Sequence, residues 1–363
     1  MAITKTATKG IRPLEQKDIG QVSTLFLESF RNKKQSEDCL NQYFREIYLE
    51  HPLRDPEIPS LVFENSGIIE GFIGVTLGKM LFRGEPVTAA VSSAFVVKAD
   101  ASGNRNPLTG ISLLREFLGG KQDLSVADAA NETTRQLWTK SGGAIAYPYS
   151  FTWTRPLQPL QAMLELDAVP STLHRYAKPG AWLGDQVATQ IPPIKPRRPD
   201  CRVEDIDSAV LLDLWSTLPK QSLVPDYDLN SLQWLIDKAC ESETEGPLAM
   251  RVVRSQKGKA LGWYVYFRKR NSIGRVLQIA AFPGSMDVVL DCLIHEAHGE
   301  GLAALRGRAE PDHLYVFNKR FCAFQGRPWC LVHSPDPDIV NAFQSADVFF
   351  SGFDGELWMK VNA

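Results

Sequence analysis

The sequence predicts a mixed α/β protein made of two tandem domains, and three observations lead to this fold class. The chain has 363 residues, which is enough for two domains of ordinary size with separate cores. Residues 191–199 are rich in proline and basic residues and lack periodicity, as is typical of a stiff linker. On both sides of this segment the strand and helix patterns follow the same order, β-α-β-β-β-α-β-α. We therefore expect in each domain a central, mostly antiparallel sheet flanked by helices, with one parallel strand pair.

The proline-rich segment also sets the expected domain boundaries. We assign residues 1–185 to an N-terminal domain, 186–200 to the linker and 201–363 to a C-terminal domain. Hydrophobic residues make up 44% of the chain and charged residues 23%, so both parts have the composition of folded globular protein.

The first domain is expected to begin with a strand, a helix and a hairpin. Residues 11–14 form the strand pattern, and apolar residues around Leu25 then recur at helical spacing. Two runs of alternating residues, 61–64 and 69–75, flank a polar turn that contains glycine. This combination predicts two antiparallel strands joined by a tight connection.

The next segment predicts a strand, a turn, a helix, a strand and a second helix. Residues 90–97 are rich in β-branched and small residues and end at a turn signal, residues 100–103. An amphipathic helix at 111–118 follows, then a strand at 123–128 and a helix within 129–143.

The second domain repeats this order with different residues. A hairpin is expected from residues 250–253 and 260–266, and a strand at 276–282 corresponds to the strand at 90–97. A helix at 286–298 and a strand at 302–308 complete the match. The repeat lies in the order of elements more than in residue identities.

Residues 105–110, Arg-Asn-Pro-Leu-Thr-Gly, open the helix of the first domain. The first-turn N–H groups of a helix lack partners, so a loop at this place is a ready anion site. The arrangement resembles the GNAT acetyltransferase superfamily, whose signature here is Arg/Gln-x-x-Gly-x-Gly/Ala. Arg105 and Gly110 match the ends of this signature, whereas Leu108 replaces the middle glycine and Pro107 lacks an amide donor. The resemblance implies that the pyrophosphate of coenzyme A is held by Arg105, Asn106, Thr109, Gly110 and Ile111.

The resemblance implies two further contacts with the donor. In the family, the strand before the loop bonds the pantetheine arm through its backbone, a role that falls here on Phe95, Val96 and Val97. A plain core strand accounts for the same residues. Asn131 matches an asparagine of the second family motif that also bonds the pantetheine arm. Because asparagine is a favoured helix N-cap, Asn131 can equally be a cap, and the two roles are compatible.

The sequence does not single out a catalytic residue. Trp138 stands where the family commonly has the tyrosine that protonates the leaving thiolate, and an indole cannot act as an acid at neutral pH. Tyr147 and Tyr149 are alternative acids, or else an aromatic pair that packs in the following strand. Ser92 is a candidate for orienting a water or the acceptor, or else a small residue in a crowded sheet.

Charge, cysteine and histidine patterns exclude several classes of protein. The net charge of −2 provides no electrostatic reason to expect nucleic acid or an anionic membrane as partner. The chain starts without an apolar signal-peptide run and has no membrane-span pattern, so we expect a cytoplasmic protein. Six cysteines without a CxxC pair, and His295 and His298 at spacing i, i+3, predict neither a metal site nor a disulfide framework.

The expected function is acyl transfer. The co-substrate is acetyl-CoA or another acyl-CoA bound by the first domain, and the acceptor is an amine or hydroxyl of a small molecule or peptide. The second domain has Phe-Pro-Gly-Ser at 282–285 in place of the loop. It is expected to form a wall of the acceptor site, to pack against the first domain, or to do both. Two alternatives stay open. Pro107, Leu108 and Trp138 favour a non-catalytic binding module, and the damaged loop also fits a Fem-type transferase that takes aminoacyl groups from tRNA.

Overall fold

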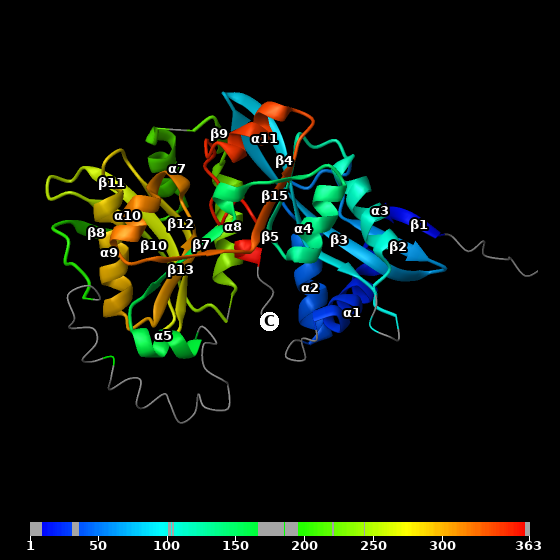
Figure 1. The fold of residues 1–363 in the computed structure, drawn as a ribbon, viewed down its shortest axis with the longest axis horizontal. Helices are drawn as coiled ribbons and strands as arrows, with labels where there is room; N and C mark the ends of the chain where they lie inside the picture. The colour runs from blue at the N-terminus through cyan, green and yellow to red at the C-terminus, as the bar shows by residue number, and fades with distance from the viewer. Residues whose placement is uncertain are drawn as a thin grey trace, which may run out of the picture.

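A computed structural model of the chain describes residues 9–30, 36–100, 103, 105–165, 185, 195–219, 221–242 and 244–359. These residues form two sheets, each with helices on its faces, that lie side by side (Figure 1). The predicted mixed α/β class, with two domains of similar design, is confirmed.

The first sheet is mostly antiparallel, and its one described parallel pair is β4 with β5. Its strands lie in the order β1 (Lys9–Pro13), β2 (Leu61–Asn65), β3 (Ile68–Phe82), β4 (Glu85–Val97), β5 (Leu124–Ala130), β15 (Trp329–His333) and β6 (Ala144–Ile145), with β9 (Leu223–Pro225) paired to β3.

The second sheet has the same character, and β12 with β13 is its described parallel pair. Its strands lie in the order β14 (Ala323–Gly326), β7 (Phe151–Pro156), β13 (Ala304–Arg308), β12 (Ile273–Ala281), β11 (Ala260–Phe267), β10 (Leu248–Arg254) and β8 (Arg202–Asp205). Both sheets therefore have the strand directions that the repeated order of elements predicts.

Helices cover both faces of each sheet. On the first sheet, one face carries α1 (Ile19–Phe30) and α2 (Glu37–Tyr48), and the other carries α3 (Pro107–Leu118) and α4 (Glu132–Lys140). On the second sheet, the corresponding pairs are α7 (Ser208–Thr217) with α8 (Leu229–Cys240), and α9 (Met286–Gly299) with α10 (Leu314–Lys319). Two further helices, α5 (Pro159–Glu165) and α11 (Pro337–Gln344), do not belong to these pairs.

Capping residues explain where several helices begin. The side chains of Asn131, Asp207 and Asp228 each accept a hydrogen bond of 2.9 Å from the backbone N–H three residues later. Such a bond satisfies one of the amides that the first helical turn leaves unpaired.

Successive side chains of a strand point to opposite faces of the sheet, so neighbouring residues enter different cores. On β2, Val62 packs under α1 and α2, whereas Phe63 packs under α3.

The two sheets exchange strands across the expected domain boundary. Strand β7 precedes the linker in sequence but pairs with β13 and β14 in the second sheet. Strands β9 and β15 follow the linker but pair with β3 and β5 in the first sheet. Membership in the two sheets therefore does not follow the boundary that the sequence predicts at the linker. The boundary at 186–200 stays a prediction, since residues 186–194 lie outside the described residues.

The last part of the chain lies between the two sheets (Figure 1). The Glu356 backbone N–H donates to Asp128 Oδ1 on β5 at 2.8 Å, and Gln278 Nε2 on β12 donates to Ser351 Oγ at 3.2 Å. A single buried cluster also runs from Phe72 of the first sheet to Trp263 of the second. This shared core fixes the two halves against each other.

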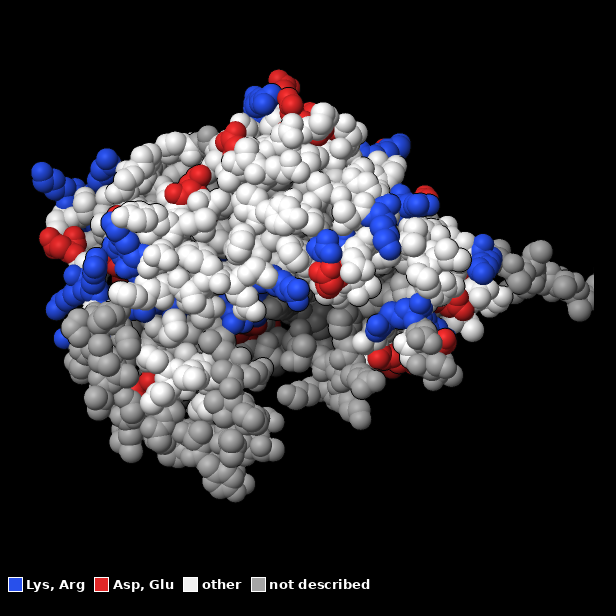
Figure 2. Space-filling view, in the orientation of Figure 1, with Lys and Arg blue, Asp and Glu red and all other residues white. Residues whose placement is uncertain are grey.

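The surface has no dominant charge on the face in view. Figure 2 shows acidic and basic side chains interspersed over this face, with much of its centre uncharged. This distribution agrees with the net charge of −2. None of the helices in the described ranges combines the length and apolar character needed to cross a membrane.

Candidate functional site

The candidate site lies where β4 and β5 part. The two strands pair only from Ala89 with Leu124 to Val91 with Val126. At that point Ser92 Oγ donates to the Val126 carbonyl at 3.3 Å, and beyond it the strands separate. Ala94 has a φ of 48°, a left-handed conformation that a non-glycine residue rarely adopts. The pairing of β4 with β3 changes register at the same place, so β4 carries a bulge that turns it away from β5.

A cavity of about 400 Å³ fills the gap, and we refer to it as the β4–β5 cleft. This volume is within the range of small-molecule sites. It is lined by both strands, by three helices and by the C-terminal segment, through Phe26, Tyr43, Tyr48, Ser92, Ser93, Ala94, Phe95, Ala127, Ala129, Ala130, Asn131, Thr134, Glu356, Leu357 and Met359.

The strand edges that face the cleft can receive an extended ligand. In this stretch β4 pairs with β3 along its far edge, through Ser93 and Val96. Strand β5 likewise pairs with β15 along its far edge, through Ala127 and Ala130. The backbone groups on the near edges therefore point at each other across the cleft. A ligand laid between them would find N–H donors and C=O acceptors on both sides.

Two tyrosines of α2 place their hydroxyls at the cleft. Tyr48 Oη lies 2.9 Å from Ser93 Oγ, and Tyr43 Oη donates to the Met359 carbonyl. Tyr48 reaches this position because Gly74 on β3 has no side chain; a Cβ there would lie 2.4 Å from the Tyr48 ring. Burial raises the pKa of both phenols, and the negative charge of Glu356 adds to this effect. Both tyrosines are therefore protonated, and able to donate, at neutral pH.

Among the described residues that line the cleft, Glu356 is the one carboxylate. The C-terminal segment brings it there, and the backbone N–H of Glu356 is held by Asp128 on β5. A carboxylate beside protonated phenols combines a proton acceptor with hydrogen-bond donors. The cleft therefore contains side chains of both kinds that acid–base chemistry needs.

The predicted anion loop lies at the end of β4. Arg105 Nε donates to the Val97 carbonyl at 3.2 Å, and Arg105 Nη2 donates to the Ser29 carbonyl at 3.5 Å. The Asn106 side chain caps α3 by accepting from the Leu108 N–H at 3.0 Å. The Leu108 side chain is 70% exposed, so it is not part of the core. Of the first amides of α3, Pro107 has none and that of Leu108 is already engaged.

The other predicted donor-site residues divide into two sets. Phe95 and Asn131 line the cleft. Asn131 is also the N-cap of α4, so its alternative role is present in the structure. Val97, Thr109 and Ile111 lie at the start of α3, where the first two are buried and Ile111 is half-buried. Val96 is buried on the opposite face of β4, in the core under α1 and α2. Gly110 is buried beside Phe95 and Val97, and a Cβ there would lie 3.5 Å from Val97.

Of the three catalytic candidates, only Ser92 lines the cleft. Tyr149 is buried, donates to the Val348 carbonyl at 2.6 Å and accepts from the Val348 N–H at 3.1 Å. Tyr147 is 59% exposed and packs edge-on against Trp329. The geometry favours packing roles for these two tyrosines. Trp138 is buried against Phe117, away from the cleft lining.

Sequence reasoning missed Tyr43, Tyr48 and Glu356. The two tyrosines belong to α2, whose apolar spacing through Leu40 and Phe44 was a readable helix signal. Glu356 follows the last helix by a dozen residues, and nothing local connects it with β5. Its place in the cleft depends on the tertiary fold.

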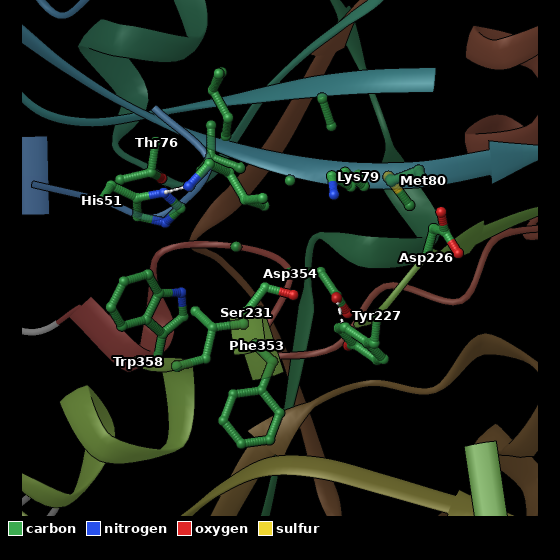
Figure 3. A pocket seen from close by; sticks show the side chains of 17 residues that line it. His51, Thr76, Lys79, Met80, Asp226, Tyr227, Ser231, Phe353, Asp354 and Trp358 are labelled. Carbon is green, nitrogen blue, oxygen red and sulfur yellow. Dashed lines mark hydrogen bonds between the residues drawn. The ribbon is translucent and has the colours of Figure 1, made fainter. Parts of the chain in front are cut away.

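A second, smaller cavity of about 50 Å³ lies between β3, α8 and the C-terminal segment (Figure 3). His51 Nδ1 accepts from the Leu53 N–H at 3.1 Å, and burial lowers the pKa of His51 to about 4. Tyr227 Oη donates to Asp354 Oδ1 at 2.5 Å (Figure 3), and burial raises the pKa of Asp354 to about 6. This volume holds one or two waters and not a substrate.

The sequence matches no known family model and no curated protein. The fold, however, matches solved structures. A probable N-acyltransferase from Enterococcus faecalis is 12% identical, with 91% of this chain and 73% of that chain covered at a TM-score of 0.58. A GCN5-related N-acetyltransferase from Anabaena variabilis has the same identity and TM-score, with coverage of 91% and 74%. The Saccharomyces cerevisiae N-myristoyltransferase, solved with bound myristoyl-CoA and inhibitors, is 12% identical with coverage of 92% and 80% at 0.53. The chain therefore has the fold of the GNAT acyltransferases.

Proposed function

We propose that the protein transfers an acyl group from a CoA thioester to an amine or hydroxyl of a small molecule or peptide, with the thioester in the β4–β5 cleft. The observation that carries this proposal is the parting of β4 from β5 beside a cavity of about 400 Å³. The open strand edges suit an extended pantetheine arm, whose amides need both donors and acceptors. The fold shared with acyl-CoA enzymes supports the same reading.

The start of α3 would hold the pyrophosphate. A guanidinium has five N–H donors, and the described contacts of Arg105 use two of its nitrogens. The remaining donors and the amide of Thr109, which has no partner within the helix, would receive the phosphate oxygens. The backbone of Phe95, Val96 and Val97, together with Asn131, would bind the pantetheine arm.

The cleft residues would carry the chemistry. Glu356 accepts a proton from the attacking amine, whose nitrogen forms the new bond to the thioester carbonyl carbon. The hydroxyls of Tyr48 and Ser93 stabilise the developing oxyanion. The C–S bond then breaks, and Tyr48 or Tyr43 donates a proton to the leaving thiolate. The proton that Glu356 took from the amine replaces it, so that the carboxylate and the phenol both return to their starting states. This assignment gives the hydroxyls of Tyr43 and Tyr48 roles for which the protonated form is required.

Calorimetric titration with acetyl-CoA, butyryl-CoA and myristoyl-CoA tests donor binding. We expect Arg105→Ala to weaken acyl-CoA binding by about 1.5–3 kcal/mol, roughly ten- to a hundredfold. Arg115→Ala is the matched control, because Arg115 is an exposed arginine in the last turn of the same helix. No binding by the parent protein, or equal binding by the Arg105→Ala variant, would overturn the proposed donor site.

A non-catalytic binding module is the second candidate, and one observation favours it. Pro107 has no N–H, and Asn106 occupies the N–H of Leu108, so the start of α3 offers fewer free amides than an intact signature. An assay of free-thiol release from acyl-CoA with a panel of amines separates the candidates. Binding without thiol release for any amine supports the module, and turnover supports the transferase.

A further inference from the structure

A third cavity, of about 190 Å³, lies against the β4–β5 cleft and shares Ala129 and Leu357 with it. Its lining comes mainly from β5, from the second sheet and from the loop after β14. Among the described residues that line it, Asp128 is the one carboxylate, against four arginines. We refer to it as the arginine pocket, defined by Arg275, Arg306, Arg308 and Arg327.

Arg308 is the most deeply buried of the four arginines. Its side chain is 5% exposed and forms an ion pair with Asp128, which is itself fully buried. The Arg308 guanidinium also lies over the Phe350 ring at 4.7 Å, with the Cys330 thiol beside it. Its Nε and Nη1 atoms are buried and have no oxygen acceptor in the described part of the chain. Asp128 therefore satisfies only part of this guanidinium.

Arg275 and Arg306 are also incompletely compensated. Arg275 Nη2 pairs with Glu245 at 2.6 Å, but its Nη1 is buried without a partner in the described ranges. Arg306 Nε donates to Thr154 Oγ1 at 3.2 Å, and none of the described ion pairs involves Arg306. Burial lowers the pKa of both arginines, and the charge of Arg306 lowers that of Arg275 further. The two guanidiniums therefore repel each other in a poorly solvated place.

Arg327 extends the positive charge to the surface. It is exposed, its guanidinium carbon lies over the Trp329 ring at 6.0 Å from the centroid, and it forms no ion pair within the described residues. The pocket thus runs from an exposed arginine to a buried one. Partly desolvated like charges cost folding free energy, and an anion that enters the pocket would offset that cost. Planar guanidiniums suit carboxylate and phosphate groups, which they can bind through two parallel hydrogen bonds.

We propose that the arginine pocket binds a carboxylate or phosphate group carried by the acyl acceptor. The acceptor would then be an anionic amine or alcohol whose nucleophile reaches the β4–β5 cleft past Ala129 and Leu357. This inference rests on the proposed acyl transfer. It explains why the second sheet contributes so many cations to a cavity that adjoins the cleft of the first.

Thermal unfolding in sodium phosphate, sodium malonate and sodium chloride at equal ionic strength tests the pocket directly. We expect phosphate or malonate to raise the midpoint by roughly 2 °C or more over chloride. The larger of the two shifts identifies phosphate or carboxylate as the preferred group. In Arg306→Gln and Arg327→Gln the anion concentration for half the shift should rise at least tenfold. Arg115→Gln, a surface arginine of α3, should behave like the parent protein.

Two further measurements make the result specific. In chloride alone Arg306→Gln should be at least as stable as the parent protein, because it removes the repulsion with Arg275. Acyl-CoA affinity should stay within about twofold of the parent value in both pocket variants.

Equal unfolding midpoints in all three salts, or anion-induced shifts that both variants retain, would overturn the proposed anion site. A tenfold loss of acyl-CoA affinity in these variants would assign the pocket to the phosphates of CoA and overturn the acceptor role. Anion binding without any acyl-CoA binding would overturn the proposed function, and with it the acceptor role, while the anion site would stand.

Discussion

At the scale of single residues, the β4–β5 cleft brings together groups that lie far apart in the sequence. Tyr48 and Ser93 share a hydrogen bond of 2.9 Å, and Glu356 lies close enough to raise the pKa of Tyr48. The tyrosine hydroxyl therefore stays protonated and can donate a hydrogen bond, whereas the Glu356 carboxylate can accept a proton. This division of roles depends on burial, because water would reduce the influence of one group on another.

Replacement of Glu356 separates binding from chemistry. If Glu356 is the base, Glu356→Gln should lower kcat by about 10²- to 10⁴-fold, since the amide cannot accept the proton. Acyl-CoA affinity should change less than twofold. Initial rates of thiol release and calorimetry on the same preparation measure the two quantities. A kcat within threefold of the parent value would remove Glu356 from the mechanism.

His51 should make the stability of the protein depend on pH. Its pKa is about 4 in the folded protein, against an ordinary value near 6.5, so between these values the unfolded chain binds more protons. Stability therefore rises with pH from about 4 to about 6.5, and His51 contributes up to about 3 kcal/mol to that rise.

Urea unfolding of the parent protein and of His51→Gln across this pH range measures the effect. Asp354 titrates in both proteins, so the difference between them isolates His51. The variant should show a flatter dependence of the unfolding free energy on pH. Parallel curves would mean that His51 is not buried in its neutral form.

At the scale of elements, the contact between α2 and β3 sets the position of Tyr48. Gly74→Ala would place a Cβ 2.4 Å from the Tyr48 ring, so the helix or the ring must shift. We expect a loss of about 1–3 kcal/mol in the free energy of unfolding, the usual range for overpacking. Gly78→Ala on the same strand is the control, because nothing lies within 4 Å of its added Cβ. Equal stability of the two variants in urea would contradict this packing.

The local sequence predicts which segments form helices and strands better than it predicts which strands pair with each other. The hairpins, the helix at 286–298 and one parallel pair in each half follow from local patterns, and β13 at Ala304–Arg308 agrees with the strand expected at 302–308. The pairing of β15 with β5 joins residues about 200 positions apart, and no local signal encodes it. No local signal places Glu356 beside β5 either. The loop at Arg105 could be located, because its sequence motif is local.

At the scale of the whole molecule, strand exchange makes the two halves depend on each other. Strand β7 completes the second sheet, β15 completes the first, and one apolar cluster spans both. A fragment with residues 1–200 would lack β15 and leave β5 and β6 without their neighbour.

We therefore expect residues 1–200 and 201–363, expressed separately, to show no cooperative thermal transition by circular dichroism. Co-expressed, they should copurify and unfold in one transition. Independent cooperative unfolding of either fragment would show that the exchanged strands are dispensable.

Acyl-CoA is proposed to occupy the β4–β5 cleft, and a bulky side chain that blocks the cleft tests this claim. Thr134 lines the cleft from α4, whereas its neighbour Thr133 is exposed and does not. Calorimetric titration of acetyl-CoA should show at least tenfold weaker binding to Thr134→Trp than to the parent protein. Thr133→Trp, with the same residue change on the same helix, should bind like the parent protein. Equal binding by both variants would place acyl-CoA elsewhere and contradict the claim.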